Sequence, residues 1–134
     1  MGVEQEATVR AFFAELEGEQ WDPDLVERAV SRMASDARYQ IHAWHDPVVG
    51  HDAIRAELLR QALIYRDSRC EIVTIASAGH TVFTERLDTG IVNDKPLTVH
   101  IVGVLEVDAE GKIAAWRDYM DSREAAIQVG ATTA

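Results

Sequence analysis

The fold of this chain is decided by the stretch TERLD at residues 84–88 and by a second stretch, AWRDYMD, at residues 115–121. Both are typical of β-strands, in which alternate side chains share one face of the sheet. Arg86 and Asp88 therefore point to the same side of one strand, and Asp118 projects from the other. If the two strands are neighbours and these faces turn inward, two carboxylates and a guanidinium meet in an apolar interior.

Burying these three charged groups is tolerable only if they are paired, because an isolated charge loses its hydration in an apolar interior. An arginine placed between two carboxylates is one way to pair them, and such a set can perform acid–base chemistry. On residue types alone, an Arg-x-Asp strand is also typical of a solvated face or of a structural ion pair. Both interpretations are open at this point.

The composition is that of a globular protein and argues against some partners. We expect a single domain over residues 1–134, because this length is enough to bury a hydrophobic core. Hydrophobic residues make up 47% of the chain and charged residues 27%, which is ordinary for a soluble protein. The net charge of -10 argues against nucleic acid and anionic membranes as partners, since both favour a basic surface.

The cellular compartment is predicted from what the sequence lacks. Cys70 is the only cysteine, which excludes an intrachain disulfide and a cysteine-based zinc site. No apolar stretch approaches the roughly 20 residues needed to cross a bilayer. Glu4 and Glu6 make the N-terminus unlike a basic signal peptide. We therefore expect a cytoplasmic protein.

The first half of the chain is predicted to be mainly helical. Residues 9–16 carry apolar side chains at helical spacing. Asp22 and Pro23 are the residue types expected at the cap and first position of a second helix. A short strand is predicted over residues 38–44, and a third helix over residues 52–63.

The second half is predicted to form antiparallel strands. Runs with β-branched residues, bounded by turn residues, indicate four strands: 70–78, 81–88, 97–107 and 112–119. Tight hairpins are expected at residues 79–80 and 108–111, and a longer connection at residues 93–96.

The order of elements predicts the fold class. Asp121 and Glu124 have the spacing of a capping box, which indicates a short terminal helix, and residues 129–134 are expected to be loose. Helices first and antiparallel strands afterwards are typical of an α+β domain, with the helices packed on one face of a curved sheet.

Three segments resemble the limonene-1,2-epoxide hydrolase family: FTERLD (83–88), GVLEV (103–107) and GKIAAWRDYMD (111–121). The resemblance is close over residues 81–121 and looser over the helical half. It implies the cone-shaped α+β fold that nuclear transport factor 2 and ketosteroid isomerase also use. In that fold a curved, mostly antiparallel mixed sheet and three to four helices enclose a deep pocket.

The resemblance also implies roles for four residues. Asp118 would be the general base that takes a proton from water, and Asp88 the general acid that protonates the epoxide oxygen. Arg86 would bridge the two acids and help to keep their protonation states different. Tyr39 matches a tyrosine that helps to hold the attacking water. The implied reaction is one-step hydrolysis of a small to medium apolar epoxide to a vicinal diol, with no metal or other cofactor.

One position departs from the family pattern. The family places an asparagine two residues after the tyrosine as a further ligand of the water, but this chain has Ile41. The isoleucine removes one hydrogen-bonding partner from a water that must be aimed at the substrate. His42, Thr98 and His100 are candidates to supply the missing contact. Without a substitute, hydrolysis is expected to be slow.

Two other functions are left open by the sequence. The same acids suit an isomerase or cyclase acting on a polyketide, terpene or steroid-like substrate, by a proton shift or by intramolecular epoxide opening. The missing asparagine favours this alternative, because an internal nucleophile needs no positioned water. A non-catalytic binding module is less favoured, because a pure binder has little reason to bury two acids.

Metal binding and self-association can also be predicted. His42, His45 and His51 are separated by a turn and lack acidic partners at helical spacing, so we expect no metal site. Relatives of this fold often pair through exposed sheet surface, and the resemblance therefore implies a homodimer.

Overall fold

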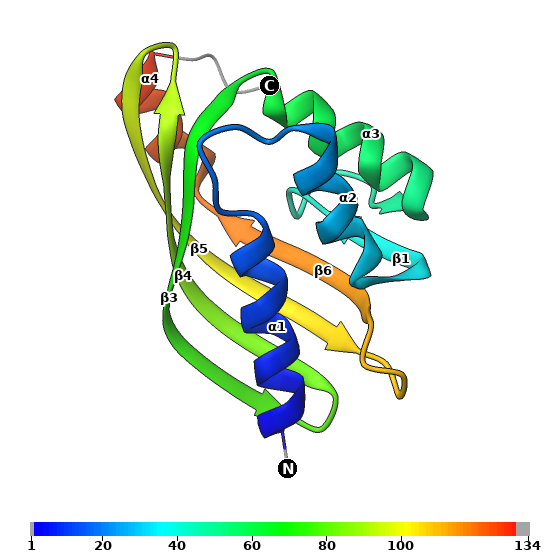
Figure 1. Ribbon diagram of the computed structural model, residues 1–134. Coiled ribbons are helices and arrows are strands. Elements are labelled where there is room, and N and C mark those ends of the chain that lie inside the picture. Colours follow the sequence, from blue (N-terminus) through cyan, green and yellow to red (C-terminus); the bar gives the residue numbers. More distant parts are fainter. Residues whose placement is uncertain (1, 131–134) are drawn as a thin grey trace.

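The chain folds into an α+β structure in which helices precede the strands and one short helix follows them (Figure 1). The computed structural model describes residues 2–130. Within these residues the helices and strands are α1 (Val3–Glu15), α2 (Pro23–Ser31), β1 (Met33–Gln40), β2 (Val48–Val49), α3 (His51–Ala62), β3 (Tyr65–Ala78), β4 (Thr81–Val92), β5 (Lys95–Val107), β6 (Ile113–Met120) and α4 (Ser122–Val129). Across residues 2–130, none of the helices has both the length and the apolar character needed to span a membrane.

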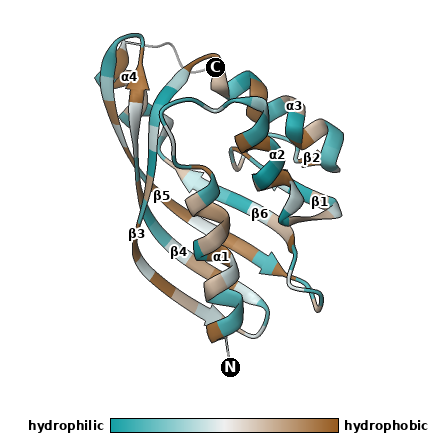
Figure 2. Ribbon diagram, viewed as in Figure 1, coloured by the Kyte–Doolittle hydropathy of each residue, from teal (hydrophilic) through white to brown (hydrophobic). Residues whose placement is uncertain are grey.

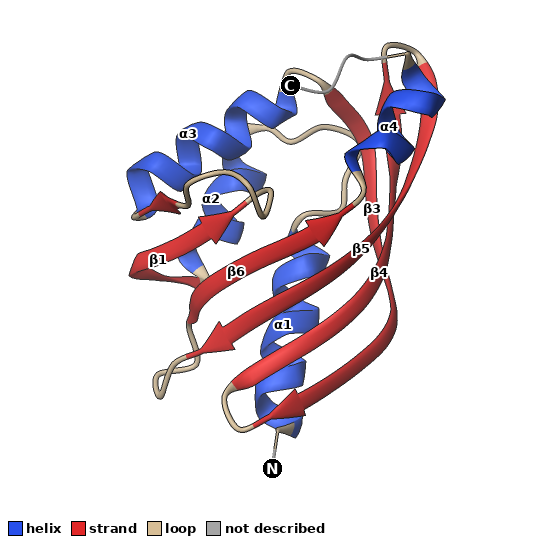
Figure 3. Ribbon diagram, turned by 180° about the vertical axis from the view of Figure 1, so that it is seen from behind, coloured by secondary structure: helices blue, strands red, loops and turns tan. Residues whose placement is uncertain are grey.

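One curved, mixed sheet contains all the strands, in the order β2-β1-β6-β5-β4-β3. Every neighbouring pair is antiparallel except β1 and β6, which are parallel. Helices α1, α2 and α3 cover one face of this sheet, whereas α4 lies beside β5 at the end farthest from the N-terminus (Figures 1 and 3). The predicted arrangement of helices on one face of a curved sheet is therefore confirmed.

Two hydrophobic clusters hold these layers together. Hydrophobic and hydrophilic residues alternate along the strands and around the helices, so that each element has an apolar side to bury (Figure 2). The larger cluster joins α1, α2 and α3 to the sheet through residues such as Phe12, Val26 and Leu105. The smaller cluster joins the ends of β4 and β5 to α4 through residues such as Val99 and Val129.

The first strand differs from its prediction. It covers Met33–Gln40 rather than residues 38–44, because it pairs with β6 from Met33 onward and the chain then turns away. Residues 41–45 form bends and turns, and the two-residue strand β2 begins at Val48. Apolar and polar side chains alternate at residues 39–43, and the predicted strand rested on this pattern. The pattern continues past the end of the strand, so it does not mark a regular β conformation here.

The connection between β4 and β5 also differs from the predicted long loop. Val92 pairs directly with Lys95, so Asn93 and Asp94 form a two-residue hairpin. Both have positive φ angles, 53° and 60°, which asparagine and aspartate tolerate better than other residues that have a Cβ. Both strands are consequently longer than predicted.

The helix caps are mostly as expected. Asp22 accepts a hydrogen bond from the backbone N–H of Leu25 at 2.8 Å and starts α2. Asp121 accepts one from the N–H of Arg123 and starts α4. Glu124 does not complete the capping box; its carboxylate accepts instead from the backbone N–H of His100 on β5.

The end of the chain was predicted to be loose from residue 129 onward. Val129 ends α4 and is buried in the smaller cluster, so that prediction is wrong for this residue. Residues 131–134 lie outside the described part of the chain.

Candidate active site

Three neighbouring strands bring the predicted charged residues together. Arg86 and Asp88 lie on β4, Asp118 lies on β6, and β5 runs between these strands. The guanidinium of Arg86 donates to both oxygens of Asp118, from Nη1 to Oδ1 and from Nη2 to Oδ2, each at 3.0 Å. It also donates to both oxygens of Asp88, from Nε at 3.1 Å and from Nη2 at 3.0 Å.

Arg86 can reach across β5 because Gly103 has no side chain. Gly103 pairs with Asp118 on one side and with Thr84 on the other. A Cβ atom at this position would lie 2.6 Å from Nη1 of Arg86 and 3.1 Å from Oδ1 of Asp118. The glycine therefore leaves the space in which the ion pair forms.

The guanidinium is buried almost completely. The side chain of Arg86 is 1% exposed, and its Cζ atom lies 4.2 Å from the centre of the Phe13 ring, where the cation contacts the π face. Burial alone would lower the pKa of Arg86, but Asp118 and Asp88 raise it above the ordinary value. Arg86 is therefore a permanent cation between two acids.

The two acids differ in their surroundings. The side chain of Asp118 is 6% exposed and that of Asp88 is 26% exposed. Asp118 accepts a further hydrogen bond, from Nε1 of Trp116 at 2.9 Å. Burial raises the pKa of Asp118 above its ordinary value, although the charge and the hydrogen bonds of Arg86 act to lower it. Asp118 is thus a buried carboxyl with a raised proton affinity, and Asp88 is the acid nearer to solvent.

Tyr39 lies on β1 with its ring stacked on Trp116, at 3.9 Å between ring centres. Its hydroxyl accepts a hydrogen bond from Nε2 of Gln61 at 3.1 Å, and the same nitrogen donates to Oε2 of Glu57 at 3.0 Å. Burial raises the pKa of Tyr39, and the charge of Asp118 raises it further. The hydroxyl therefore keeps its proton and can donate it to a partner.

The end of β1 at Gln40 changes the positions of the next two residues. On a continued strand, Ile41 and His42 would face opposite sides, yet both line the same cavity as the acids. Burial lowers the pKa of His42, which favours the neutral ring. The other two candidates for the missing contact bind α4: Thr98 pairs through its backbone with Gln128, and His100 with Glu124.

A cavity of about 370 Å³ opens between the two hydrophobic clusters. Its polar lining includes Arg86, Asp88, Asp118 and Tyr39, so the four predicted site residues share one space. The apolar lining comes from α1, β4, β5, β6 and α4, and includes Phe13, Val92, Leu97, Val99, Ile101, Met120 and Val129. The cavity therefore offers a largely apolar volume with charged groups at one place.

Sequence reasoning missed three residues that support this site. Gly103 lay within a segment quoted only for its resemblance, although a lone glycine inside a strand signals a close approach. Phe13 lies in the apolar run at residues 9–16, which was used only to predict a helix. Gln61 gave no signal, because its contact with Tyr39 joins residues far apart in the sequence.

His45, in the turn after β1, and His51, at the start of α3, each have a ring nitrogen near a backbone carbonyl oxygen. Nε2 of His51 lies 2.9 Å from the carbonyl oxygen of Met33, and Nδ1 of His45 lies 3.0 Å from that of Asp46. Among residues 2–130 we find no group of three or more histidine, cysteine or acidic side chains placed to hold a metal ion.

The family follows from comparison with known proteins. Residues 3–129 match the family model described as the limonene-1,2-epoxide hydrolase catalytic domain. The chain belongs to this family. A solved structure of an LEH-like epoxide hydrolase from M. tuberculosis shares 28% identity with this member, with a TM-score of 0.73 over 91% of this chain and 86% of that one.

Two more distant structures share the fold of this family member. A protein from Catenulispora acidiphila with a ketosteroid isomerase-like fold, solved with trimethylamine, is 20% identical, with a TM-score of 0.79 over 93% of each chain. The epoxide hydrolase/cyclase-like enzyme SalBIII, described for pyran ring formation in the polyether salinomycin, is 17% identical, with a TM-score of 0.78 over 92% of this chain and 97% of that one. The fold thus has ketosteroid isomerase-like and cyclase-like neighbours.

Replacing Gly103 with alanine tests whether the open space on β5 is needed. We expect Gly103→Ala to lower the free energy of unfolding by roughly 1–3 kcal/mol, the usual range for overpacking, because the new methyl group displaces Arg86 or Asp118. Chemical denaturation measures this loss. Val104→Ala, at the next position on the same strand, is the control and should lower the free energy of unfolding less. If Gly103→Ala were as stable as the unchanged protein, the packing described here would be contradicted.

Proposed function

We propose that this protein is a cofactor-independent epoxide hydrolase that adds water to a small to medium epoxide in one step and releases a vicinal diol. The observation that carries the proposal is the buried guanidinium of Arg86, shared by the carboxyl groups of Asp88 and Asp118 at one side of an apolar cavity. Family membership and the resemblance to an LEH-like epoxide hydrolase support the same reaction.

The charge balance of the site favours one proton on the pair of acids. Arg86 neutralises one carboxylate, so two ionised acids would leave a net negative charge in a poorly hydrated space. One acid is then ionised while the other carries a proton. This is the condition for pulling a proton from water and giving another to the epoxide oxygen in the same step.

The assignment of the two roles rests on hydrogen bonding and on position. Asp118 accepts three N–H groups, which stabilise its ionised form and oppose the rise that burial causes in its pKa. Asp118 is therefore the base that activates water. Asp88 accepts from Arg86 alone and is nearer to solvent, so it delivers the proton to the departing oxygen.

Tyr39 positions the attacking water in this proposal. Its hydroxyl accepts from Gln61 and so has its own proton free to donate toward the water. Because Gln61 is bound to Glu57, the orientation of the hydroxyl is set from α3. The O–H groups of the water then remain available to donate to Asp118.

A second candidate function is favoured by Ile41. This residue lines the cavity where other members have an amide ligand for water, and it offers no hydrogen bond. A substrate hydroxyl acting as the nucleophile would need no such ligand. The alternative is therefore an isomerase or cyclase that uses the same acids for a proton shift or for intramolecular epoxide opening. The description of SalBIII as epoxide hydrolase/cyclase-like, in pyran ring formation, supports the cyclase form of this alternative.

We also propose that two copies pair through the outer face of the sheet. This face carries half-exposed apolar side chains on neighbouring strands, among them Phe83 (42%), Val102 (49%) and Tyr119 (42%). Val102 pairs with Tyr119 across β5 and β6, so the apolar groups are adjacent. A second copy would remove them from water.

The roles of the acids predict the effect of removing each one. We expect Asp118→Asn and Asp88→Asn each to lower diol formation from styrene oxide or cyclohexene oxide roughly a hundredfold to ten-thousandfold. Asp36→Asn, an exposed aspartate on β1, is the control. Diol formation unaffected by Asp118→Asn would reject the mechanism.

The raised pKa of Asp118 also predicts the pH dependence of hydrolysis. We expect kcat/KM to fall with decreasing pH at a pH above 3.8, the ordinary pKa of an aspartate, because protonated Asp118 cannot accept a proton.

The role of Ile41 separates the two candidate functions. If water is the nucleophile and is poorly held, Ile41→Asn restores a ligand and should raise the rate of epoxide hydrolysis several-fold, as expected for one added hydrogen bond. Ile41→Leu keeps the apolar character and serves as the control. No gain, or a loss, would mean that another group aims the water or that water is not the nucleophile.

Self-association is tested by placing lysines on the outer face of the sheet. We expect the protein to be a dimer by light scattering coupled to size-exclusion chromatography, and the double variant Phe83→Lys with Val102→Lys to be a monomer. Ile127→Lys, on α4 and also highly exposed, should leave the dimer intact. A monomeric unchanged protein would contradict the proposal.

A further inference from the structure

Two hydrogen-bond donors outside the acid pair line the same cavity. Arg60 lies in the last turn of α3, and Tyr65 begins β3, so the short connection at residues 63–64 keeps them close. Both line the cavity that contains Asp88 and Asp118. The side chain of Arg60 is 57% exposed, which places it where the cavity meets solvent.

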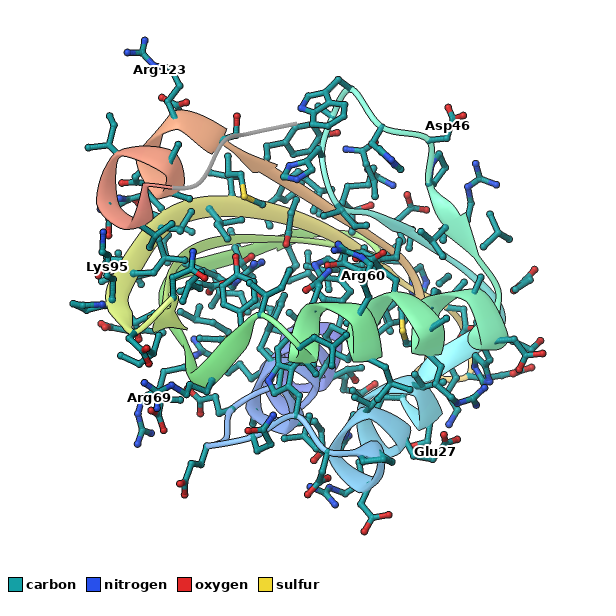
Figure 4. All side chains as sticks on the ribbon, turned by 90° about the horizontal axis from the view of Figure 1, so that it is seen from above. Glu27, Asp46, Arg60, Arg69, Lys95 and Arg123 are labelled. Carbon is teal, nitrogen blue, oxygen red and sulfur yellow. The ribbon has the colours of Figure 1, made fainter. Side chains whose placement is uncertain are left out.

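The position of Arg60 is unusual among the charged surface residues labelled in Figure 4. Its side chain lies between α3 and the curved sheet, whereas those of Arg69, Lys95 and Arg123 lie at the periphery of the molecule. Arg60 therefore lines the cavity, whereas Arg69, Lys95 and Arg123 do not.

Within the described part of the chain, the guanidinium of Arg60 has unpaired N–H groups, and its charge is balanced by Glu57. Its Nε and Nη2 atoms donate to the two oxygens of Glu57, at 3.0 and 2.7 Å. This pairing neutralises the guanidinium locally, and among the described residues its Nη1 group has no hydrogen-bond partner. Arg60 therefore offers free N–H groups that belong to a neutral ion pair.

Tyr65 adds an O–H donor beside it. Among residues 2–130 the Tyr65 hydroxyl has no hydrogen-bond partner. Burial raises the pKa of Tyr65, and the charge of Asp88 raises it further, so the hydroxyl keeps its proton. Across the cavity, the wall from β5 and α4 is apolar and includes Leu97, Val99 and Val129.

We propose that Arg60 and Tyr65 form a subsite for a neutral oxygen of the substrate, a carbonyl or a hydroxyl, at the end away from the epoxide. This inference rests on the proposed function, because the subsite shares the cavity of the acids. The substrate is then an oxygenated epoxide whose hydrocarbon portion lies along the apolar wall, and a plain hydrocarbon epoxide uses only part of the site.

A carboxylate is a poorer match for this subsite than a neutral oxygen. Glu57 already neutralises Arg60, and Arg86 is bound to both acids, so the described lining of the cavity offers a carboxylate no unpaired cation. The net charge of -10 also repels anions from the whole molecule. A neutral acceptor gains the free donors without that repulsion.

Three matched substrates test the subsite: an ω-epoxy methyl ketone, the ω-epoxy hydrocarbon of equal length and the corresponding ω-epoxy carboxylate. We expect kcat/KM to be roughly tenfold higher for the ketone than for the hydrocarbon, the effect of one or two hydrogen bonds. In Arg60→Met and in Tyr65→Phe this ratio should fall toward one, and Arg69→Met, outside the cavity, should leave it unchanged. An unchanged ratio in both subsite variants, or a preference for the carboxylate, overturns the inference.

Binding distinguishes a failure of the subsite from a failure of the hydrolase proposal. The saturated methyl ketone, which lacks the epoxide, should bind the protein more tightly than the alkane in calorimetry, and Arg60→Met should remove the difference. If no epoxide is hydrolysed yet this binding difference is found, the subsite stands and the hydrolase proposal fails. Equal binding of ketone and alkane by the unchanged protein overturns the subsite whatever the activity.

Discussion

The buried guanidinium of Arg86, shared by two carboxyl groups, is the interaction on which the rest of the site depends. It uses Nε, Nη1 and Nη2 to bind both acids, and it packs on the ring of Phe13. A lysine could not replace it, since one ammonium cannot present the same planar set of donors. The cation makes burial of two acids tolerable, and because it balances only one negative charge, it favours a proton on the pair.

The architecture of the chain follows from placing this ion network in a largely apolar cavity between two hydrophobic clusters. The larger cluster fixes α1 and Trp116, and through them one side of Arg86 and Asp118. The smaller cluster fixes α4 over the ends of β4 and β5 and closes the apolar side of the cavity. Glu57 on α3 binds both Gln61 and Arg60, so one carboxylate supports the predicted water ligand and the proposed oxygen subsite.

Much of the fold and the charged centre could be predicted from sequence, because local rules apply to strands and hairpins. Alternation was enough to place Arg86 and Asp88 on one face of β4, but the family resemblance was needed to predict that this face and Asp118 turn inward. Other features depend on distant contacts that no local pattern reports. The end of β1 at Gln40 follows from its pairing with β6, and it brings His42 into the cavity beside Ile41.

The origin of the oxygen in the first molecule of diol tests the proposed chemistry most directly. The protein, in excess over an epoxide, is reacted in ¹⁸O-labelled water, and both the diol and the peptides that contain Asp88 and Asp118 are examined by mass spectrometry. Direct attack by water activated by Asp118 predicts one ¹⁸O atom in the diol of this single turnover and no label in either aspartate. Unlabelled diol together with ¹⁸O in a carboxyl group would contradict it, because the carboxylate itself would then have attacked the epoxide.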